Sequence, residues 1–240
     1  MKAAWTRTIR VLERAESDGR NCLLEHEVYA VLKEAGIAAP RHVLVPAGRP
    51  VTRRDLGELG SAKVVLKIVS PLIVHKSDVG GVAFVKADPA SVNKASAAML
   101  RSVPFRYLAW MKKHVRHGVP GLALALKAVR ESIRGFLVAE TVDFDDVGFG
   151  SEILLGLRNS RDFGPVLTVG GGGVDVEYMN ERLKEGRAAA IGSAHLLDAE
   201  KAQGLLEPLA FFGKLAAEYP GRKPREAPKL LRSEDHTSEL

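Results

Sequence analysis

The chain of 240 residues has a single cysteine, Cys22, and only 6% aromatic residues. One cysteine excludes an internal disulfide and a cysteine-rich zinc site, and it fits a reducing compartment such as the cytoplasm. The net charge is +6, but no basic stripe interleaved with aromatic residues is present, so we expect no nucleic-acid binding. Attraction of small polyanions is a sufficient reason for the positive sign.

Long apolar runs are also missing. None approaches the about 20 residues that a membrane-spanning helix needs, and the first ten residues carry Arg7 and Arg10 where a signal peptide has its apolar segment. We therefore expect a cytoplasmic protein without a membrane segment. Hydrophobic residues make up 46% and charged residues 27% of the chain, which is typical of soluble globular proteins. The length suits one large domain or two small ones.

The most informative stretch covers residues 63–85 and reads KVVLKIVSPLIVHKSDVGGVAFV. Its first part is rich in β-branched residues and predicts a buried strand, within which Lys67 is costly unless its ammonium meets an anion. A polar loop with His75 follows and closes on Gly80-Gly81. Two glycines let the backbone approach a ligand, and free N–H groups there form an anion nest. The pattern favours a polyphosphate between two strands, although a strand lysine and a loop histidine also occur without any function.

Helical spacing predicts further elements around this stretch. Pro104 is expected to separate a helix that begins at Asp88-Pro89 from a second helix over about 105–117. The remaining expected elements are a helix at about 23–35, strands at 41–45, 134–142, 151–157 and 165–169, a turn at 158–163, and a mainly helical segment at 198–219 with Pro208 as a kink or break. Periodicity does not assign the apolar run at 122–126, for which we favour a helix.

Three strings in the sequence resemble one family, the nucleoside-diphosphate-forming acyl-CoA synthetases, in their ATP-grasp part. The strings are VLKIVSPLIVHKSDVGGV, SEILLGLRNSRDFGPVLTVGGGGVDVE and LLEHEVYAVLKEAGIAAPRHVLV. Acetate–CoA ligase (ADP-forming) is the best-known member, and succinyl-CoA synthetase is a relative. The resemblance covers roughly residues 23–215. It implies an α+β protein with the ATP-grasp fold, in which two α+β subdomains clamp a nucleotide.

The same resemblance implies a division of the chain. Residues 1–22 would be a helical linker, and residues 23–231 the ATP-grasp domain. Its lid would be about 49–132, and its base 23–48 plus 133–231. The last residues, 232–240, read RSEDHTSEL and look like a non-native tail derived from a sequencing adapter.

Site roles follow from the resemblance at matching positions. Lys67 would neutralise phosphate oxygens, while Gly80, Gly81 and the Val82 N–H would fix the β- and γ-phosphates. His75 matches the loop histidine that carries the phosphoryl group transiently, although it could instead only hydrogen-bond the phosphate. Lys67 and His75 are therefore the expected catalytic residues.

The resemblance also implies a hinge strand at 134–142. The adenine edge would be held by Ala139, Glu140 and Val142. The alternative is that Glu140 is simply a solvated carboxylate at the end of a strand. Glu152 would lie near the phosphates. The four glycines at 170–173 could cradle phosphate or mark a close strand crossover.

The implied function is that of the ATP-binding component of an ADP-forming acyl-CoA synthetase, which is a ligase that uses ATP/ADP and Mg²⁺. It would pass a phosphoryl group between the nucleotide and a phosphohistidine relay. Its partners would be a CoA-binding and ligase subunit or fused domains of the same enzyme. The metal ligands are unknown, because the Asn-Pro pair that usually accompanies them is missing; Asp175 and Glu177 are candidates.

Three alternatives remain open at this point. The chain could be a nucleotide-binding module without turnover, as in an acetyltransferase-linked regulator that carries a similar region. It could be a truncated, inactive fragment. It could also be another ATP-grasp ligase with a different acid and acceptor, against which the HKSDVGG string argues.

Overall fold

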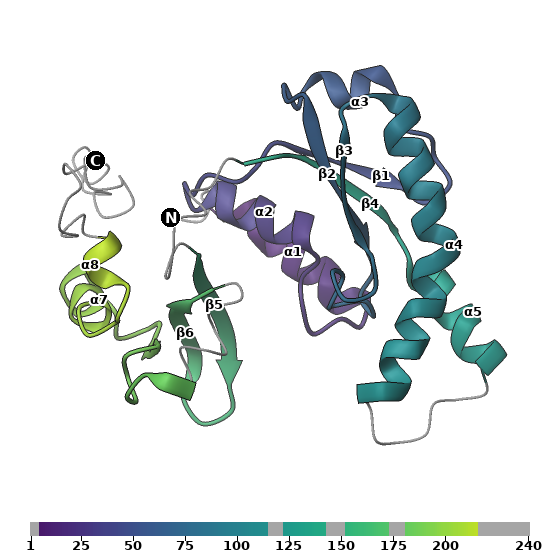
Figure 1. Ribbon diagram of the computed structural model, residues 1–240. Coiled ribbons are helices and arrows are strands. Elements are labelled where there is room, and N and C mark those ends of the chain that lie inside the picture. The colour runs from purple at the N-terminus through teal and green to yellow at the C-terminus, as the bar shows by residue number, and fades with distance from the viewer. Residues whose placement is uncertain (1–4, 115–121, 143–151, 173–180, 216–240) are drawn as a thin grey trace. The chain divides into compact units, whose positions relative to one another are not determined.

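The computed structural model describes residues 5–114, 122–142, 152–172 and 181–215. It divides into two compact units, Met1–Val142 and Asp143–Leu240 (Figure 1). The predicted lid (about 49–132) and base (23–48 plus 133–231) do not coincide with these units. Strands from both predicted parts are hydrogen-bonded in one sheet.

The sheet of the first unit has the strand order β1-β4-β2-β3. Its strands are β1 (His42–Pro46), β2 (Lys63–Val69), β3 (Val82–Lys86) and β4 (Gly135–Glu140), and every neighbouring pair is antiparallel. β4 therefore enters the centre of the sheet after a long excursion of the chain. In this register Lys67 lies opposite Leu137 of β4 and Val82 of β3.

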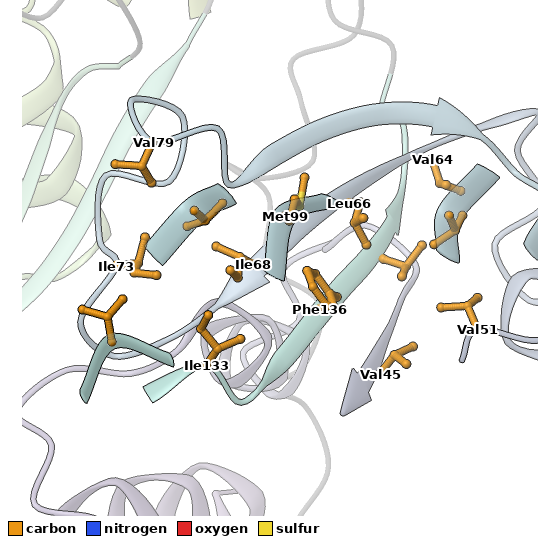
Figure 2. Packing of buried hydrophobic residues seen from close by; sticks show 14 of the residues in the cluster. Val45, Val51, Val64, Leu66, Ile68, Ile73, Val79, Met99, Ile133 and Phe136 are labelled. Carbon is orange, nitrogen blue, oxygen red and sulfur yellow. The ribbon is translucent and has the colours of Figure 1, made fainter. Parts of the chain in front are cut away.

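One face of this sheet builds the core of the unit. Successive side chains of a strand point to opposite faces, so Val64, Leu66 and Ile68 share a face and all three are fully buried. They pack with α4 (Pro89–His114) and α5 (Leu122–Ser132), as Figure 1 shows for the helices and Figure 2 for the side chains. The other face of β2 presents Val65, Lys67 and Val69, and it is the side on which α2 (Glu25–Glu34) lies.

The predicted break at Pro104 is wrong. α4 is one continuous helix of 26 residues with Pro104 inside it. A proline in a helix interior removes one backbone hydrogen bond, but Pro104 is buried, as are Val103 and Leu108 beside it. Packing of this helix on the sheet therefore outweighs the local cost. The predicted helix at 122–126 is confirmed, and the predicted end near His117 lies outside the described residues.

The predicted linker at 1–22 is largely a helix, α1 (Thr6–Ser17), which packs against α2. The carboxylate of Glu34 in α2 accepts hydrogen bonds from the backbone N–H groups of Arg7 at 3.0 Å and Thr8 at 2.6 Å. Both groups lie at the N-terminus of α1, where a negative charge satisfies unpaired N–H groups and the helix dipole. α1 is thus fastened to the first unit at its start.

A buried ion pair fastens the other end of α1 to α2. Arg20 donates from Nη1 to Glu27 Oε2 and from Nη2 to Glu27 Oε1, both at 2.7 Å, and Glu27 Oε2 also accepts from the Leu24 N–H at 2.7 Å. The side chains of Arg20 and Glu27 are only 6% and 9% exposed. Burial raises the pKa of Glu27, but the bonds from Arg20 and Leu24 outweigh it and hold this pKa below its ordinary value.

We expect Arg20→Met to lower the free energy of unfolding by about 3 kcal/mol, because it leaves the Glu27 carboxylate buried without its cation. Urea denaturation monitored by circular dichroism measures the change. Arg10→Met on exposed α1 is the matched control and should change stability by less than about 0.5 kcal/mol. Equal effects of the two substitutions would contradict the assigned role of the Arg20–Glu27 pair.

The second unit contains a three-stranded antiparallel sheet in the order β5-β6-β7. Its strands are β5 (Ile153–Ser160), β6 (Gly164–Gly171) and β7 (Ala189–Ser193), followed by α7 (Ala199–Leu206) and α8 (Phe212–Leu215). The predicted turn at 158–163 begins too early, because residues 158–160 still pair with β6. A break at Pro208 is confirmed between α7 and α8. Leu209 and Phe211 form a small buried cluster under the sheet.

Among the described residues, no helix is both long enough and apolar enough to cross a bilayer.

Candidate functional site

The Lys67 ammonium forms an ion pair with a residue of α2. Lys67 Nζ donates to Glu25 Oε1 at 2.5 Å, across 42 positions of sequence. The side chain of Lys67 is 26% exposed and that of Glu25 19%, so both charges are partly shielded from water. The sequence predicted that a lysine within this strand requires an anion, and in the unliganded chain that anion is a carboxylate.

Glu25 is the centre of this charge cluster. Its Oε1 also accepts from the Tyr29 hydroxyl at 2.8 Å, and its Oε2 pairs with Lys76 Nζ at 3.4 Å. Burial raises the pKa of Glu25, but the hydrogen bonds from Lys67 and Tyr29 and the charges of Lys67 and Lys76 outweigh it, so the pKa lies below its ordinary value. Glu25 is therefore an anion near neutral pH, held between two cations.

Two residues of this cluster were missed by sequence analysis. Lys76 stands in the HKSDVGG string and could have been considered, because a second cation next to His75 suits a phosphate site. Glu25 gave no signal of its own: it is one acidic residue in the first turn of a predicted helix, where acidic residues are common. Only the packing of α2 on the sheet brings it to Lys67.

In the unliganded chain, the N–H groups that were expected to form an anion nest at Gly80-Gly81 are engaged within the loop. The Gly80 N–H donates to the Ser77 carbonyl at 3.1 Å, and the Gly81 N–H donates to the Lys76 carbonyl at 2.6 Å. Both N–H groups therefore close the loop on itself instead of facing a ligand. This turn fixes the backbone at Lys76, whose ammonium reaches Glu25.

Steric reasons explain why both positions are glycines. Gly80 has φ +71°, a conformation that side chains rarely adopt, and a Cβ there would lie 2.2 Å from Arg106 Nη1 of α4. A Cβ on Gly81 would lie 2.7 Å from Ile68 Cγ2 and 3.0 Å from the Lys76 carbonyl oxygen. Ile68 belongs to the core face of β2, whereas Lys67 points to the α2 face. A side chain at position 81 would therefore point to the core face of the sheet, whereas the Lys67 side chain points to the α2 face.

His75 lies exposed in the loop between β2 and β3. Its ring stacks on the indole of Trp110 in α4, with centroids 5.2 Å apart and planes inclined by 27°. The loop is anchored on both sides of His75 by the buried side chains of Ile73 and Val79. His75 and Lys76 are neighbours in sequence, but the His75 ring contacts α4 while Lys76 reaches α2.

The predicted nucleotide-facing role of Glu140 is not supported by its contacts. Both of its oxygens are engaged by Arg41: Oε1 accepts from the Arg41 backbone N–H, and Oε2 accepts from Nε, each at 2.7 Å. In the register of the sheet, Glu140 lies opposite Val64, on the face away from Lys67. The strand period therefore places Lys67 and Glu140 on opposite faces. Sequence analysis overlooked this alternation.

The other two hinge residues differ in their surroundings. Ala139 is 1% exposed and lies opposite Val65 and His42 in the centre of the sheet, on the same face as Lys67. Val142 is 57% exposed and is the last residue of the first unit. Ala139 therefore shares a face with the charge cluster, whereas Val142 stands at the boundary between the units.

In the second unit, Glu152 is exposed, and its carbonyl accepts from the Gly172 N–H at 2.8 Å. A Cβ on Gly172 would lie 3.2 Å from Glu152, and a Cβ on Gly170 would lie 3.0 Å from the Ala189 Cβ. These contacts favour the reading of Gly170–Gly172 as a close strand approach. Gly173, Asp175, Glu177 and the proposed non-native tail at 232–240 lie outside the described residues.

A metal centre is not formed by the described residues: residues 5–114, 122–142, 152–172 and 181–215 contain no group of three His, Cys, Asp or Glu side chains that could hold an ion. The predicted Mg²⁺ is therefore not assigned to ligands here.

Comparisons with known proteins relate the whole arrangement to one family. The sequence matches the ATP-grasp domain over residues 14–109 and 111–234. It is 28% identical over 177 residues to 4-hydroxybutyrate–CoA ligase [ADP-forming] of Nitrosopumilus maritimus, a match that covers 72% of this chain and 21% of the relative. It is 26% identical over 171 residues to acetate–CoA ligase [ADP-forming] I subunit beta of Pyrococcus furiosus, covering 71% of this chain and 61% of that subunit.

Solved structures agree with this relationship. ACD1 of Ca. Korarchaeum cryptofilum in complex with coenzyme A superposes with a TM-score of 0.61 and 26% identity, covering 93% of this chain and 81% of that chain. A structure of acetyl-coenzyme A synthetase 1 of the same organism with coenzyme A and Mg-AMPPCP gives a TM-score of 0.53 and 26% identity, covering 93% and 80%. The fold is thus the predicted ATP-grasp fold. The chain belongs to the ATP-grasp domain family and is similar to the part of the ADP-forming CoA ligases that carries this domain.

Proposed function

We propose that the chain is the ATP-binding component of an ADP-forming acyl-CoA synthetase. The overall reaction converts acyl-CoA, ADP and phosphate to the free acid, CoA and ATP, and reverses. Within it, this chain transfers a phosphoryl group between ADP and His75. The proposal follows the matched relatives, of which the chain spans 21% in one case and 61% in another.

One observation in the structure carries the proposal. Lys67 and Lys76 converge from a strand and from its loop on one carboxylate, at 2.5 and 3.4 Å. A phosphate is also a compact, multidentate oxyanion, so two ammonium groups arranged around Glu25 are arranged for a phosphate group as well. We infer that nucleotide phosphate displaces the Glu25 carboxylate from these lysines.

Apart from His75, no residue of the chain needs to form a covalent bond in this transfer. A phosphoryl group leaves the His75 ring nitrogen as a β-phosphate oxygen of ADP attacks the phosphorus: the N–P bond breaks, an O–P bond forms, and the ring nitrogen keeps the electron pair. Catalysis consists mainly of positioning and charge neutralisation. The two lysines would supply the charge, and the loop that Gly80-Gly81 closes would supply the position of His75. Neutral imidazole is nucleophilic near neutral pH, as the reverse step requires.

Partners and metal belong to the proposal as well. The Pyrococcus furiosus relative is named as a beta subunit, so we propose that a CoA-binding and ligase subunit, or fused domains, complete the enzyme. Magnesium would arrive with the nucleotide phosphates, since a relative's structure contains Mg-AMPPCP. It would neutralise phosphate charge when bound.

Binding of Mg-ATP tests the phosphate site. We expect Mg-ATP to raise the melting temperature of the chain, and Lys67→Ala to weaken Mg-ATP binding about tenfold, the effect of one lost hydrogen bond between charged groups. Differential scanning fluorimetry and isothermal titration calorimetry measure the two quantities. Lys63→Ala is the matched control, because Lys63 lies on the same face of β2 and is exposed. Equal affinities of the Lys67 and Lys63 variants would show that the phosphate site lies elsewhere.

A nucleotide-binding module without turnover is the second candidate. It is favoured by the pairing of both oxygens of Glu140, the predicted nucleotide-facing carboxylate, with Arg41. The two candidates differ in phosphate transfer. A module binds Mg-ATP with the affinity expected above but never acquires phosphate on His75 in the presence of a partner subunit.

A further inference from the structure

One contact of the His75 ring has no part in the proposed function. Its ring lies over Trp110, and Trp110 is in turn stacked on His114, with centroids 4.6 Å apart and an interplanar angle of 22°. Tyr107 continues the row at 6.2 Å from Trp110 and 13°. Three of these four rings stand on α4 at helical spacing, so the helix presents a row of flat rings to the loop.

Contacts on both sides of the stack limit its movement. The Trp110 side chain is half-buried and packs against the core of the first unit, and the His114 Nδ1 lies 2.8 Å from the Trp110 carbonyl oxygen. On the loop side, Ile73 and Val79 are buried at 0% and 1% exposure. The indole is thus the fixed partner, and the short exposed segment that carries His75 is the part that can move away.

The contact depends on the charge of the imidazole. The face of an indole carries negative electrostatic potential, so it attracts a neutral or cationic ring laid on it. A phosphoryl group on His75 would bring close to two negative charges to the same place, and the indole face would repel them. The stack therefore suits the unphosphorylated ring.

We propose that Trp110 is a positioning residue for His75. Its indole holds the unphosphorylated imidazole in one place on α4. The stacking contact is lost when the imidazole becomes phosphorylated. Docking of His75 on Trp110 stands by itself, whereas its release on phosphorylation rests on the proposed function.

Tryptophan fluorescence tests the docking without any catalytic assay. The chain has two tryptophans, so Trp5→Phe leaves Trp110 as the only tryptophan, which is excited at wavelengths that tyrosine does not absorb. A stacked imidazole quenches indole emission, and we expect His75→Gln in this background to raise its intensity and shift its wavelength. Because His75 is exposed, the substitution does not disturb the core. His42→Gln is the matched control, since the His42 ring contacts Tyr29 instead, and it should leave the emission unchanged. Unchanged emission in His75→Gln overturns the proposal.

A second measurement tests the positioning role. In single-turnover phosphorylation with Mg-ATP and the partner subunit, Trp110→Leu should slow labelling of His75 about tenfold, and Trp110→Phe, which keeps an aromatic face, should recover most of the rate. Equal rates in all three proteins would overturn the positioning role. If the fluorescence change occurs but the parent is never labelled, the docking stands and the proposed function fails. The two inferences are thereby distinguished.

Discussion

Replacing His75 with asparagine should abolish the phosphate that the chain acquires from ATP. Asparagine is close in size to histidine but has no ring nitrogen that can form an N–P bond, so the nucleophile is lost and no neighbouring group replaces it. Lys76 is adjacent, but its ammonium is paired with Glu25. The loop around position 75 keeps its anchors, because Ile73 and Val79 are buried independently of His75.

The experiment mixes the chain with its partner subunit and Mg-ATP radiolabelled at the γ-phosphate. The parent should carry label that survives base and is removed by acid, as expected of phosphohistidine, and His75→Asn should carry only background. His114→Asn is the matched control, because His114 stacks on the same indole but stands on α4 instead of the loop. Label retained by His75→Asn would assign the carrier to another residue and would leave His75 as a residue that only contacts phosphate.

The sequence was most informative for β2, whose residues alone predict a strand and a charge partner for Lys67. The β-branched run at 64–69 predicted β2, and the lysine inside it predicted a buried anion. The strand is confirmed. The anion predicted for Lys67 was a nucleotide phosphate, which stays a prediction, and in the unliganded chain Lys67 meets Glu25, 42 positions earlier in the sequence. Periodicity shows that a helix begins near Glu25. It does not show which strand that helix covers, since this depends on the packing of α2 over the face that Lys67 occupies.

Predictions that required tertiary geometry failed for identifiable reasons. The Gly80-Gly81 pair has the composition of an anion nest, but its N–H groups close the loop in the unliganded chain. Glycine is favoured at position 80 by the positive φ and at position 81 by the contacts with Ile68 and the Lys76 carbonyl. The base was predicted as two segments, 23–48 and 133–231, with the lid between them. The sheet joins β1 and β4 of that base to β2 and β3 of that lid, with β4 in the middle. A central strand contributed late by the chain cannot be placed from sequence order.

The arrangement around Glu25 predicts that a substitution in the site tightens nucleotide binding. In the free chain, Lys67 and Lys76 are engaged by this carboxylate, so a phosphate must displace it before it can bind them. Glu25→Gln keeps the shape and can still accept from the Tyr29 hydroxyl, but it removes the charge. If the displaced contacts are worth about 2 kcal/mol, as is usual for hydrogen bonds between charged groups, the affinity for Mg-ATP rises about 30-fold.

Isothermal titration calorimetry of the parent and Glu25→Gln measures this gain, and its pH dependence supplies an independent check. Because the pKa of Glu25 lies below its ordinary value, the parent carboxylate is ionised throughout the range from about pH 6 to 8. The gain should therefore be constant across this range. Glu34→Gln is the matched control in the same helix, since Glu34 contacts the start of α1 and neither lysine. A loss of affinity in Glu25→Gln would mean that the carboxylate orients Lys67 and Lys76 for the nucleotide, so that the cluster would be part of the loaded site instead of a competitor that the phosphate replaces.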